Sequence, residues 1–318
     1  MRESFVAYLA DSGSGLSLAM MADLPSVFAV ALESYINILW HSHRTIGEAR
    51  HLIAYLKRDF PPMRPYLSGA WSLVTRWEIA EPLRHRTPLP ETLYKAMVAL
   101  ALMWGWPRFA AVLTLAFEGV ARIGEVLRAK RAQVTLPSDA LCPRPHVFLT
   151  IINPKTARRG GALVQHIRVT GISVAAQLES TLGPLPGDSG IFGDAVDNGP
   201  KFRRLWDRVL NALQVPPSCG LLPGGIRGGG AVSAYDSDLP LENLLWRMRL
   251  ASRTTLEHYL QEVSAINALG PVSKAAKADI LEVAELLPAL RLASAFTRVA
   301  SSGSSSPPTL EGSDVKGC

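Results

Sequence analysis

The segments His146-Val-Phe-Leu-Thr-Ile-Ile-Asn153 and Ala162-Leu-Val-Gln-His-Ile-Arg-Val169 interrupt a chain whose pattern is otherwise helical. Both are rich in β-branched residues, which favour strands. They flank Pro154-Lys-Thr-Ala-Arg-Arg-Gly-Gly161, a stretch that combines turn-forming residues with basic side chains. We therefore expect a β-hairpin with a basic tip. With helical patterns on both sides, the predicted fold class is mainly α with a small β-sheet.

Outside the hairpin the chain divides by composition. Residues 1–25 give no clear pattern, and residues 26–80 predict a small helical domain. The stretch 81–90 is rich in proline and arginine, which is typical of a linker. A second, larger domain covers 91–270, followed by one helix over 271–300 and a Ser/Gly/Pro-rich tail, 301–318, that we expect to be disordered.

Two local patterns support the small helical domain. Thr45 and Glu48 form a capping box, which satisfies free N–H groups at a helix start. The residues before it predict a preceding helix, because helical spacing recurs at Val27, Val30, Ala31, Ser34/Tyr35 and Ile38.

Positive charge is concentrated in one part of the sequence. The 318 residues carry a net charge of +6. Residues 122–168 contain nine Lys and Arg and two acidic residues, Glu125 and Asp139, so the net charge of this stretch is +7 and that of the rest of the chain is −1. Such a block is typical of a protein with a phosphate-rich partner.

The cysteines and acidic residues exclude several classes of protein. The three cysteines, Cys142, Cys219 and Cys318, form no C-x-x-C pair, so we expect no disulfide scaffold and no metal site, and a reducing, intracellular location. A secretory signal is not expected either, because acidic residues interrupt the N-terminus.

The most apolar stretch, 96–117, is the one membrane candidate. The sequence Gly105-Trp-Pro-Arg108 breaks it into pieces too short to span a bilayer. We therefore expect two buried helices that meet at a turn, and no membrane partner.

Four segments carry candidate chemistry, in this order. Arg122 lies in Gly119-Val-Ala-Arg-Ile-Gly-Glu-Val-Leu-Arg128, Lys155 in Asn153-Pro-Lys-Thr156 at the hairpin tip, and Arg227 in Gly224-Gly-Ile-Arg-Gly-Gly-Gly230. Tyr259 lies near the start of a predicted helix in Trp246-Arg-Met-Arg-Leu-Ala-Ser-Arg-Thr-Thr-Leu-Glu-His-Tyr-Leu-Gln-Glu262. The glycine run lacks the Lys-Ser/Thr ending of a nucleotide-binding loop.

Over about residues 28–265, these four segments resemble the tyrosine recombinases, or phage integrases, and in style their divergent eukaryotic members derived from mobile elements. The resemblance implies a helical, SAM-like core-binding domain that binds DNA, followed by an α+β catalytic domain. It implies DNA cleavage and rejoining, as in site-specific recombination or integration, with duplex DNA as partner and no cofactor. It also implies a synaptic tetramer on DNA, and a nuclear location in a eukaryote.

The resemblance assigns a role to each residue. Arg122 and Arg227 would bind the non-bridging phosphate oxygens, where paired guanidinium donors stabilise developing charge. Lys155 would protonate the leaving 5′ oxygen, and Tyr259 would form a 3′-phosphotyrosyl link. Taken singly, each residue has a plain alternative: a surface arginine, a solvated lysine, or a tyrosine packed in a helix core with Leu256 and Val263.

Two positions depart from the family pattern. Gly224 stands where the family has histidine, and Leu250 where it has histidine or tryptophan. Loss of a general acid–base group costs about 10²–10⁴-fold in rate, and loss of one charge-stabilising donor about 10²–10³-fold. The alternatives are therefore a DNA-binding relic that no longer cleaves, or a helical interaction protein with another acidic partner.

Further basic residues predict contacts to the DNA backbone, with plain solvated faces as the alternative. They are Arg44, Lys57, Arg58, Arg158, Arg159, Lys201, Arg203 and Arg204. The C-terminal helix either docks on a neighbouring subunit or covers its own domain, through Ile280, Val283, Leu286, Leu287 and Leu290.

Overall fold

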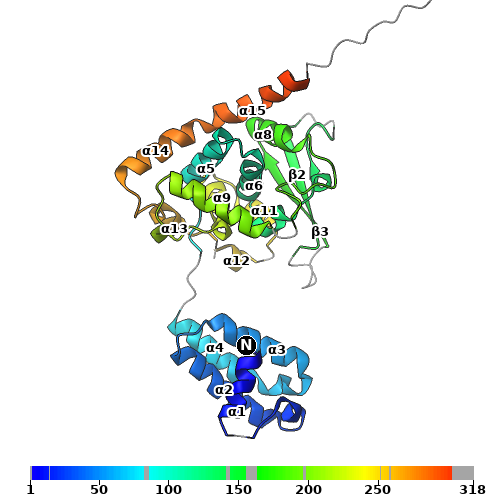
Figure 1. Ribbon diagram of the computed structural model, residues 1–318, viewed down its shortest axis with the longest axis vertical. Coiled ribbons are helices and arrows are strands. Elements are labelled where there is room, and N and C mark those ends of the chain that lie inside the picture. Colours follow the sequence, from blue (N-terminus) through cyan, green and yellow to red (C-terminus); the bar gives the residue numbers. More distant parts are fainter. Residues whose placement is uncertain are drawn as a thin grey trace, which may run out of the picture. The chain divides into compact units, whose positions relative to one another are not determined.

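The computed structural model describes residues 2–13, 15–81, 86–140, 144–154, 163–195, 198–250, 252–257 and 259–302 (Figure 1). The chain separates into two compact units, Met1–His85 and Arg86–Cys318. The fold class is as expected from the sequence: a helical unit, followed by a mainly helical unit with a small antiparallel sheet.

The described residues of the first unit include four α-helices: α1 (Arg2–Asp11), α2 (Pro25–His41), α3 (Ile46–Asp59) and α4 (Ser68–Ala80). Part of the stretch 1–25, which gave no clear pattern, is thus the helix α1, and its Phe5 and Leu9 are buried in the core of this unit. The capping box is confirmed at the start of α3, where the Glu48 carboxylate accepts from the Thr45 backbone N–H at 3.4 Å.

The expected helix is confirmed as α2, but the residues noted for their helical spacing do not form its buried face. Val27, Val30 and Ile38 are exposed, and Val30 is 65% exposed. The buried stripe is displaced by about one residue and consists of Phe28, Ala29, Leu32, Tyr35, Ile36 and Leu39. This face carries the larger apolar side chains, so more apolar surface is removed from water when it turns inward.

The second unit contains one three-stranded sheet in the order β1-β2-β3. The hairpin is confirmed: β2 (His146–Ile152) and β3 (Val164–Thr170) pair antiparallel, with Leu149 opposite Ile167. A short strand, β1 (Val134–Thr135), adds to β2. Alternate residues of β2 and β3 are buried, so one face of the sheet packs on the core.

The helices of the second unit surround this core (Figure 1). They are α5 (Glu91–Met103), α6 (Pro107–Glu118), α7 (Ile123–Leu127), α8 (Ile172–Leu182), α9 (Gly199–Ala212), α10 (Ile226–Asp236), α11 (Leu241–Met248), α12 (Arg253–Glu257), α13 (Glu262–Asn267), α14 (Lys274–Glu285) and α15 (Leu287–Ser302).

The apolar stretch 96–117 covers the second part of α5 and nearly all of α6, and these two buried helices meet at a turn, as predicted. Gly105, at φ +70°, makes the turn between them, and this left-handed conformation favours glycine. Within the described residues, no helix has the length and apolar character that a membrane span requires.

The second half of the expected linker belongs to the second unit. Pro88 and Leu89 are buried, and the Leu89 backbone N–H donates to the Gly225 carbonyl at 3.2 Å. Glycines of α10 allow this close approach: a Cβ on Gly229 would lie 2.0 Å from the Leu89 carbonyl oxygen, and one on Gly230 would lie 2.1 Å from that of Phe117. The glycine run therefore serves backbone packing.

Two helices, α14 and α15, replace the single helix expected over 271–300. The break falls at Leu286, because Pro288 has no N–H to continue the helix. Both helices pack on their own unit, α14 against α5 and α15 against α8, and Ile280 and Leu287 are buried there. In the structure, this region therefore covers its own domain, which was one of the two expected arrangements. The tail beyond Ser302 lies outside the described residues.

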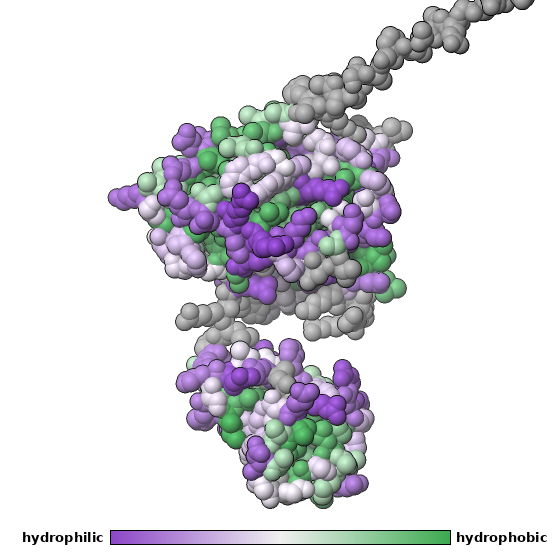
Figure 2. Space-filling view, in the orientation of Figure 1, coloured by the Kyte–Doolittle hydropathy of each residue, from purple (hydrophilic) through white to green (hydrophobic). Residues whose placement is uncertain are grey.

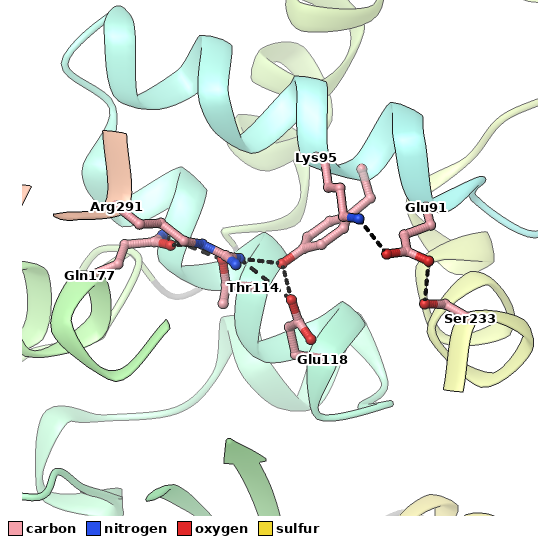
Figure 3. A network of polar contacts seen from close by, with 8 residues as sticks. Glu91, Lys95, Thr114, Glu118, Gln177, Ser233 and Arg291 are labelled. Carbon is pink, nitrogen blue, oxygen red and sulfur yellow. Dashed lines mark hydrogen bonds and ion pairs between the residues drawn. The ribbon is translucent and has the colours of Figure 1, made fainter. Parts of the chain in front are cut away.

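A buried polar network fastens α15 to this unit (Figure 3). Arg291 donates from Nε to the Gln177 side chain at 2.8 Å and from Nη2 to the Tyr94 hydroxyl at 2.7 Å. The Tyr94 hydroxyl in turn donates to Glu118 at 3.0 Å. Burial raises the pKa of Tyr94, so this hydroxyl keeps its proton. The network joins α5, α6, α8 and α15.

Candidate functional site

Arg122 lies at the start of α7. The chain leaves α6 through Gly119, where a Cβ would lie 2.3 Å from Ile167 on β3, so only glycine lets the helix and the sheet come this close. Arg122 is the N-cap residue of α7, and its side chain is 27% exposed. Its Nη1 donates to Oε1 of Glu125 at 2.9 Å. The first candidate arginine is thus held by a carboxylate on its own helix.

Arg227 lies in the first turn of α10 and is only 3% exposed. Its Nη2 donates to the Met248 carbonyl at the end of α11. Among the described residues, its buried Nε and Nη1 have no hydrogen-bond partner. Burial and the nearby charge of Arg122 lower the pKa of Arg227 to about 10, so the group is still protonated at neutral pH. A buried cation with unused donors is suited to an anionic ligand.

Tyr259 lies beside Arg227, although its local structure differs from our prediction. It is in a turn between α12 and α13, not near the start of a continuous helix. Its backbone N–H and that of Leu260 both donate to the carbonyl of Leu256, which lies in the last turn of α12. The Arg227 Cζ lies 5.2 Å from the centre of the Tyr259 ring, a cation–π contact.

The alternative interpretation of Tyr259, a tyrosine packed in a hydrophobic core with Leu256 and Val263, agrees with part of the structure. Its ring is half-buried and packs against a small apolar cluster that includes Leu256 and Met248. Val263, the other expected neighbour, is exposed. Core packing alone therefore does not account for the position of Tyr259 over a buried arginine.

Glu125 connects the site to a third arginine. Its Oε1 accepts from Arg122, and its Oε2 accepts from Nη2 of Arg249 at 2.7 Å. Although burial raises the pKa of Glu125, Arg249 and Arg122 outweigh it, and the pKa stays below its ordinary value. The cluster thus holds three guanidiniums and one carboxylate.

Sequence reasoning missed both Arg249 and the bridging role of Glu125. They are 124 residues apart, so no local pattern links them. One local signal was present: Arg249 directly precedes Leu250, a position that the family resemblance had already marked as unusual.

Three predicted site residues lie outside the described residues. They are Lys155, Arg158 and Arg159, which lie in the sequence between the residues of β2 and those of β3. The described strands end at Ile152 and resume at Val164, and the Asn153 backbone N–H donates to the Leu163 carbonyl at 2.8 Å. The structure therefore brings together Arg122, Arg227 and Tyr259, and Lys155 stays a prediction.

The two unusual positions have clear structural surroundings. Leu250 is half-buried and packs on the same apolar cluster as Tyr259. At Gly224, a Cβ would lie 1.9 Å from Nη1 of Arg86, so the Arg86 guanidinium occupies the space that a side chain at 224 would need. A cation from the segment before α5 thus replaces a side chain at the start of α10.

The remaining predicted DNA-binding residues are exposed. Arg44, Lys57 and Arg58 lie on or beside α3, and Lys201, Arg203 and Arg204 lie on α9. Figure 2 shows hydrophilic side chains gathered on the face of the second unit where α9 lies. Three of these arginines pair with a neighbouring carboxylate, Arg44 with Glu48, Arg58 with Asp59 and Arg203 with Asp207. Such surface pairs are weak, so they leave the arginines available to phosphate.

A separate cleft of about 600 Å³ lies between the end of α7 and the start of α9. Its charged lining is mixed, with Arg128 and Lys130 beside Asp188 and Asp194. This lining favours neither a negatively charged nor a positively charged ligand. Among the described residues, no cluster of His, Cys, Asp and Glu has the arrangement of a metal site.

The chain is similar to the crystal structure of XerA recombinase, with 15% sequence identity and a TM-score of 0.43, over 87% of this chain and 96% of that chain. No family model matches the chain, and no curated protein matches it.

Proposed function

We propose that this protein binds duplex DNA and cleaves and rejoins one of its strands, with Tyr259 as the nucleophile. The supporting observation is the cluster around Arg227. A nearly fully buried guanidinium keeps two unused nitrogens, lies against a tyrosine ring and is close to a second arginine. Burying this much positive charge is costly unless an anion completes the site.

The charge of the cluster fits a reacting phosphodiester. Arg122, Arg227 and Arg249 contribute three positive charges, and Glu125 contributes one negative charge, so the group is +2. A phosphodiester carries one negative charge, and its pentacoordinate transition state carries about two. The site therefore matches the transition state better than the ground state, which is the requirement for catalysis.

In the proposed step, one bond to phosphorus forms as another breaks, and the number of protons and the total charge stay the same. The Tyr259 hydroxyl oxygen bonds to phosphorus and its proton passes to water, while the bond from phosphorus to the 5′ oxygen breaks. The 5′ oxygen takes a proton, for which Lys155 is the proposed donor. The 3′-phosphotyrosyl link retains the energy of the original bond, so a 5′ hydroxyl reverses the step without metal or ATP.

The exposed basic residues complete the proposed interaction with DNA. The α3 and α9 groups would bind backbone phosphates in a salt-dependent and sequence-independent way. We propose strand exchange of the recombination or integration type, in an assembly of several copies on DNA, and in the nucleus if the source is eukaryotic.

A second candidate function is DNA binding without cleavage. Gly224 brings no side chain to the site, and Leu250 brings an apolar one that packs on the hydrophobic cluster. Without these two polar groups, a slow or inactive enzyme is the alternative.

Covalent capture distinguishes these functions. The full chain is incubated with a pool of nicked DNA fragments, in which the cleaved strand releases a short piece that cannot religate, and adducts are separated under denaturing conditions. We expect a covalent adduct from the wild type and none from Tyr259→Phe, with equal DNA binding by both. No adduct from the wild type, with DNA binding intact, would favour the binding function. An adduct from Tyr259→Phe would exclude Tyr259 as the nucleophile.

A further inference from the structure

Arg249 has an unusual position for an arginine. It ends α11 in the left-handed conformation, at φ 56° and ψ 45°, which is unfavourable for a side chain of this size. Glycine or asparagine is the common choice at such a helix end. An arginine here points to a function for the side chain that outweighs the backbone cost.

The Arg249 side chain turns inward and is held on two sides. It is 7% exposed, and its Nη2 donates to Glu125 on α7 at 2.7 Å. Its Nη1 donates to the Gln165 side chain on β3 at 3.2 Å. These contacts fix the plane of the guanidinium from two separate elements.

One nitrogen of Arg249 is unused. Within the described part of the chain, its buried Nε has no hydrogen-bond partner, and the same is true of Nε and Nη1 of Arg227. The two arginines are neighbours, because Arg227 donates to the carbonyl of Met248, the residue before Arg249. The charge of Arg249 also contributes to the lowered pKa of Arg227.

The cluster therefore has unused donors on two adjacent buried cations. Like charges this close repel each other, and Glu125 balances only one of the three. A bound anion would satisfy the free donors and remove the repulsion in one step.

We propose that Arg249 is a third phosphate-binding residue of this site and supplies the charge stabilisation that Leu250 does not. This inference rests on the proposed function, because it takes a DNA phosphodiester as the anion. Arg249 donates to a non-bridging oxygen of the scissile phosphate, and Glu125 and Gln165 hold it in position.

The competing explanation is a purely structural ion pair that fastens the end of α11 to α7. The variant Arg249→Asn is suited to test the two, because asparagine tolerates the left-handed conformation while the positive charge and the guanidinium donors are lost, together with the ion pair to Glu125. The two measurements below then separate a phosphate contact from the ion pair. Lys274→Gln is the matched control. It also removes one positive charge from the second unit, at an exposed position on α14.

Two measurements test the proposal. The first is the affinity for a duplex oligonucleotide over a range of salt concentrations. Affinity falls as salt rises, and loss of one phosphate contact makes the negative slope of log affinity against log salt shallower by about 0.9. We expect this shallower slope in Arg249→Asn and not in Lys274→Gln. An unchanged slope in folded Arg249→Asn would contradict the proposal.

The second measurement compares adduct formation on a normal phosphodiester and on a methylphosphonate, which lacks the negative oxygen. We expect Arg249→Asn to slow the normal reaction by about 10²–10³-fold and to have little effect on the methylphosphonate. An equal loss on both substrates would indicate a structural role.

The outcomes also separate this inference from the proposed function. If the wild type forms no adduct but Arg249→Asn makes the slope of log affinity against log salt shallower, the proposed cleavage is rejected and the proposed phosphate contact of Arg249 is supported. If the wild type cleaves and Arg249→Asn cleaves equally fast, only the Arg249 inference fails. Should Arg249→Asn not fold, Arg249→Lys decides: we expect a wild-type salt slope with a rate at least about tenfold lower, since a point charge replaces a fork of donors. An unchanged rate in this variant would contradict the proposal.

Discussion

Glu125 binds two arginines that come from different elements, Arg122 on α7 and Arg249 at the end of α11. Its carboxylate is buried, and both of its oxygens accept hydrogen bonds. Removing one partner from a buried ion pair leaves the other charges uncompensated, and this costs more than the pair itself contributes. A substitution of Glu125 therefore tests whether this carboxylate stabilises the arginine cluster.

We expect Glu125→Gln to lower the free energy of unfolding by about 3–5 kcal/mol at pH 7, measured by urea denaturation. The control is Glu242→Gln, which removes an exposed pair with Arg253 at 3.5 Å and should cost less than about 1 kcal/mol. Because the pKa of Glu125 is lowered in the folded state, its contribution is complete above about pH 4.5 and is lost as pH falls through the folded pKa. A difference between wild type and variant that disappears above pH 5 would contradict this account.

Gly224 and Arg86 make a second prediction at the residue scale. Since a Cβ at 224 would lie 1.9 Å from the Arg86 guanidinium, a histidine there needs Arg86 to move. We expect Gly224→His with Arg86→Ala to form adduct up to about 10²-fold faster than Arg86→Ala alone, and Gly224→His alone to gain less. Equal rates of adduct formation in the single and double histidine variants would show that Arg86 does not occupy this space in solution.

The resemblance to the tyrosine recombinases implies that Arg122, Arg227 and Tyr259 belong to one site. In the structure, the Arg227 Cζ lies 5.2 Å from the centre of the Tyr259 ring, and the nearby charge of Arg122 lowers the pKa of Arg227. Arg249 was not predictable in the same way, because its role depends on a left-handed residue and a partner in a distant element. Neither feature leaves a local pattern in the sequence.

At the scale of elements, strong local signals predicted the structure and weak ones did not. The runs of β-branched residues predicted β2 and β3, and the capping box predicted the start of α3. The break at Gly105 predicted the turn between α5 and α6. In α2, the helical spacing of Val27, Val30 and Ile38 predicted the helix but not its buried face. The buried face lies opposite the polar side of this helix, which carries Ser26, Glu33, Ser34, Asn37 and His41. The break around Tyr259 depends on how Leu256 and Leu260 pack in tertiary structure.

The glycine-rich start of α10 provides a prediction for an element. We expect Gly230→Ala to lower the free energy of unfolding by about 1–3 kcal/mol, because its Cβ would lie 2.1 Å from the Phe117 carbonyl oxygen. Gly228→Ala is the control. Its Cβ would lie 3.6 Å from Pro88, an ordinary contact, so we expect a gain of about 0.5–1 kcal/mol from reduced chain entropy. A similar effect of both substitutions in urea denaturation would show that α10 does not pack this closely.

At the scale of the whole molecule, each unit has its own hydrophobic core. The core of the first unit includes Phe28, Leu32 and Trp77, and the main core of the second includes Phe109 and Trp206. Among the described residues, each buried apolar cluster belongs to one unit, so we expect fragments 1–85 and 86–318 each to unfold cooperatively on their own. The measurement is urea denaturation followed by circular dichroism. A fragment without a cooperative transition would show that it depends on the other unit.

The central claim is that the buried arginine cluster positions a DNA phosphate for attack by Tyr259. The most direct test is mass spectrometry of the covalent product after nuclease and protease digestion. We predict a nucleotide attached through its 3′ phosphate to the Tyr259 oxygen. A nucleotide on another residue, or DNA binding by the wild type without any attached nucleotide, would contradict the claim.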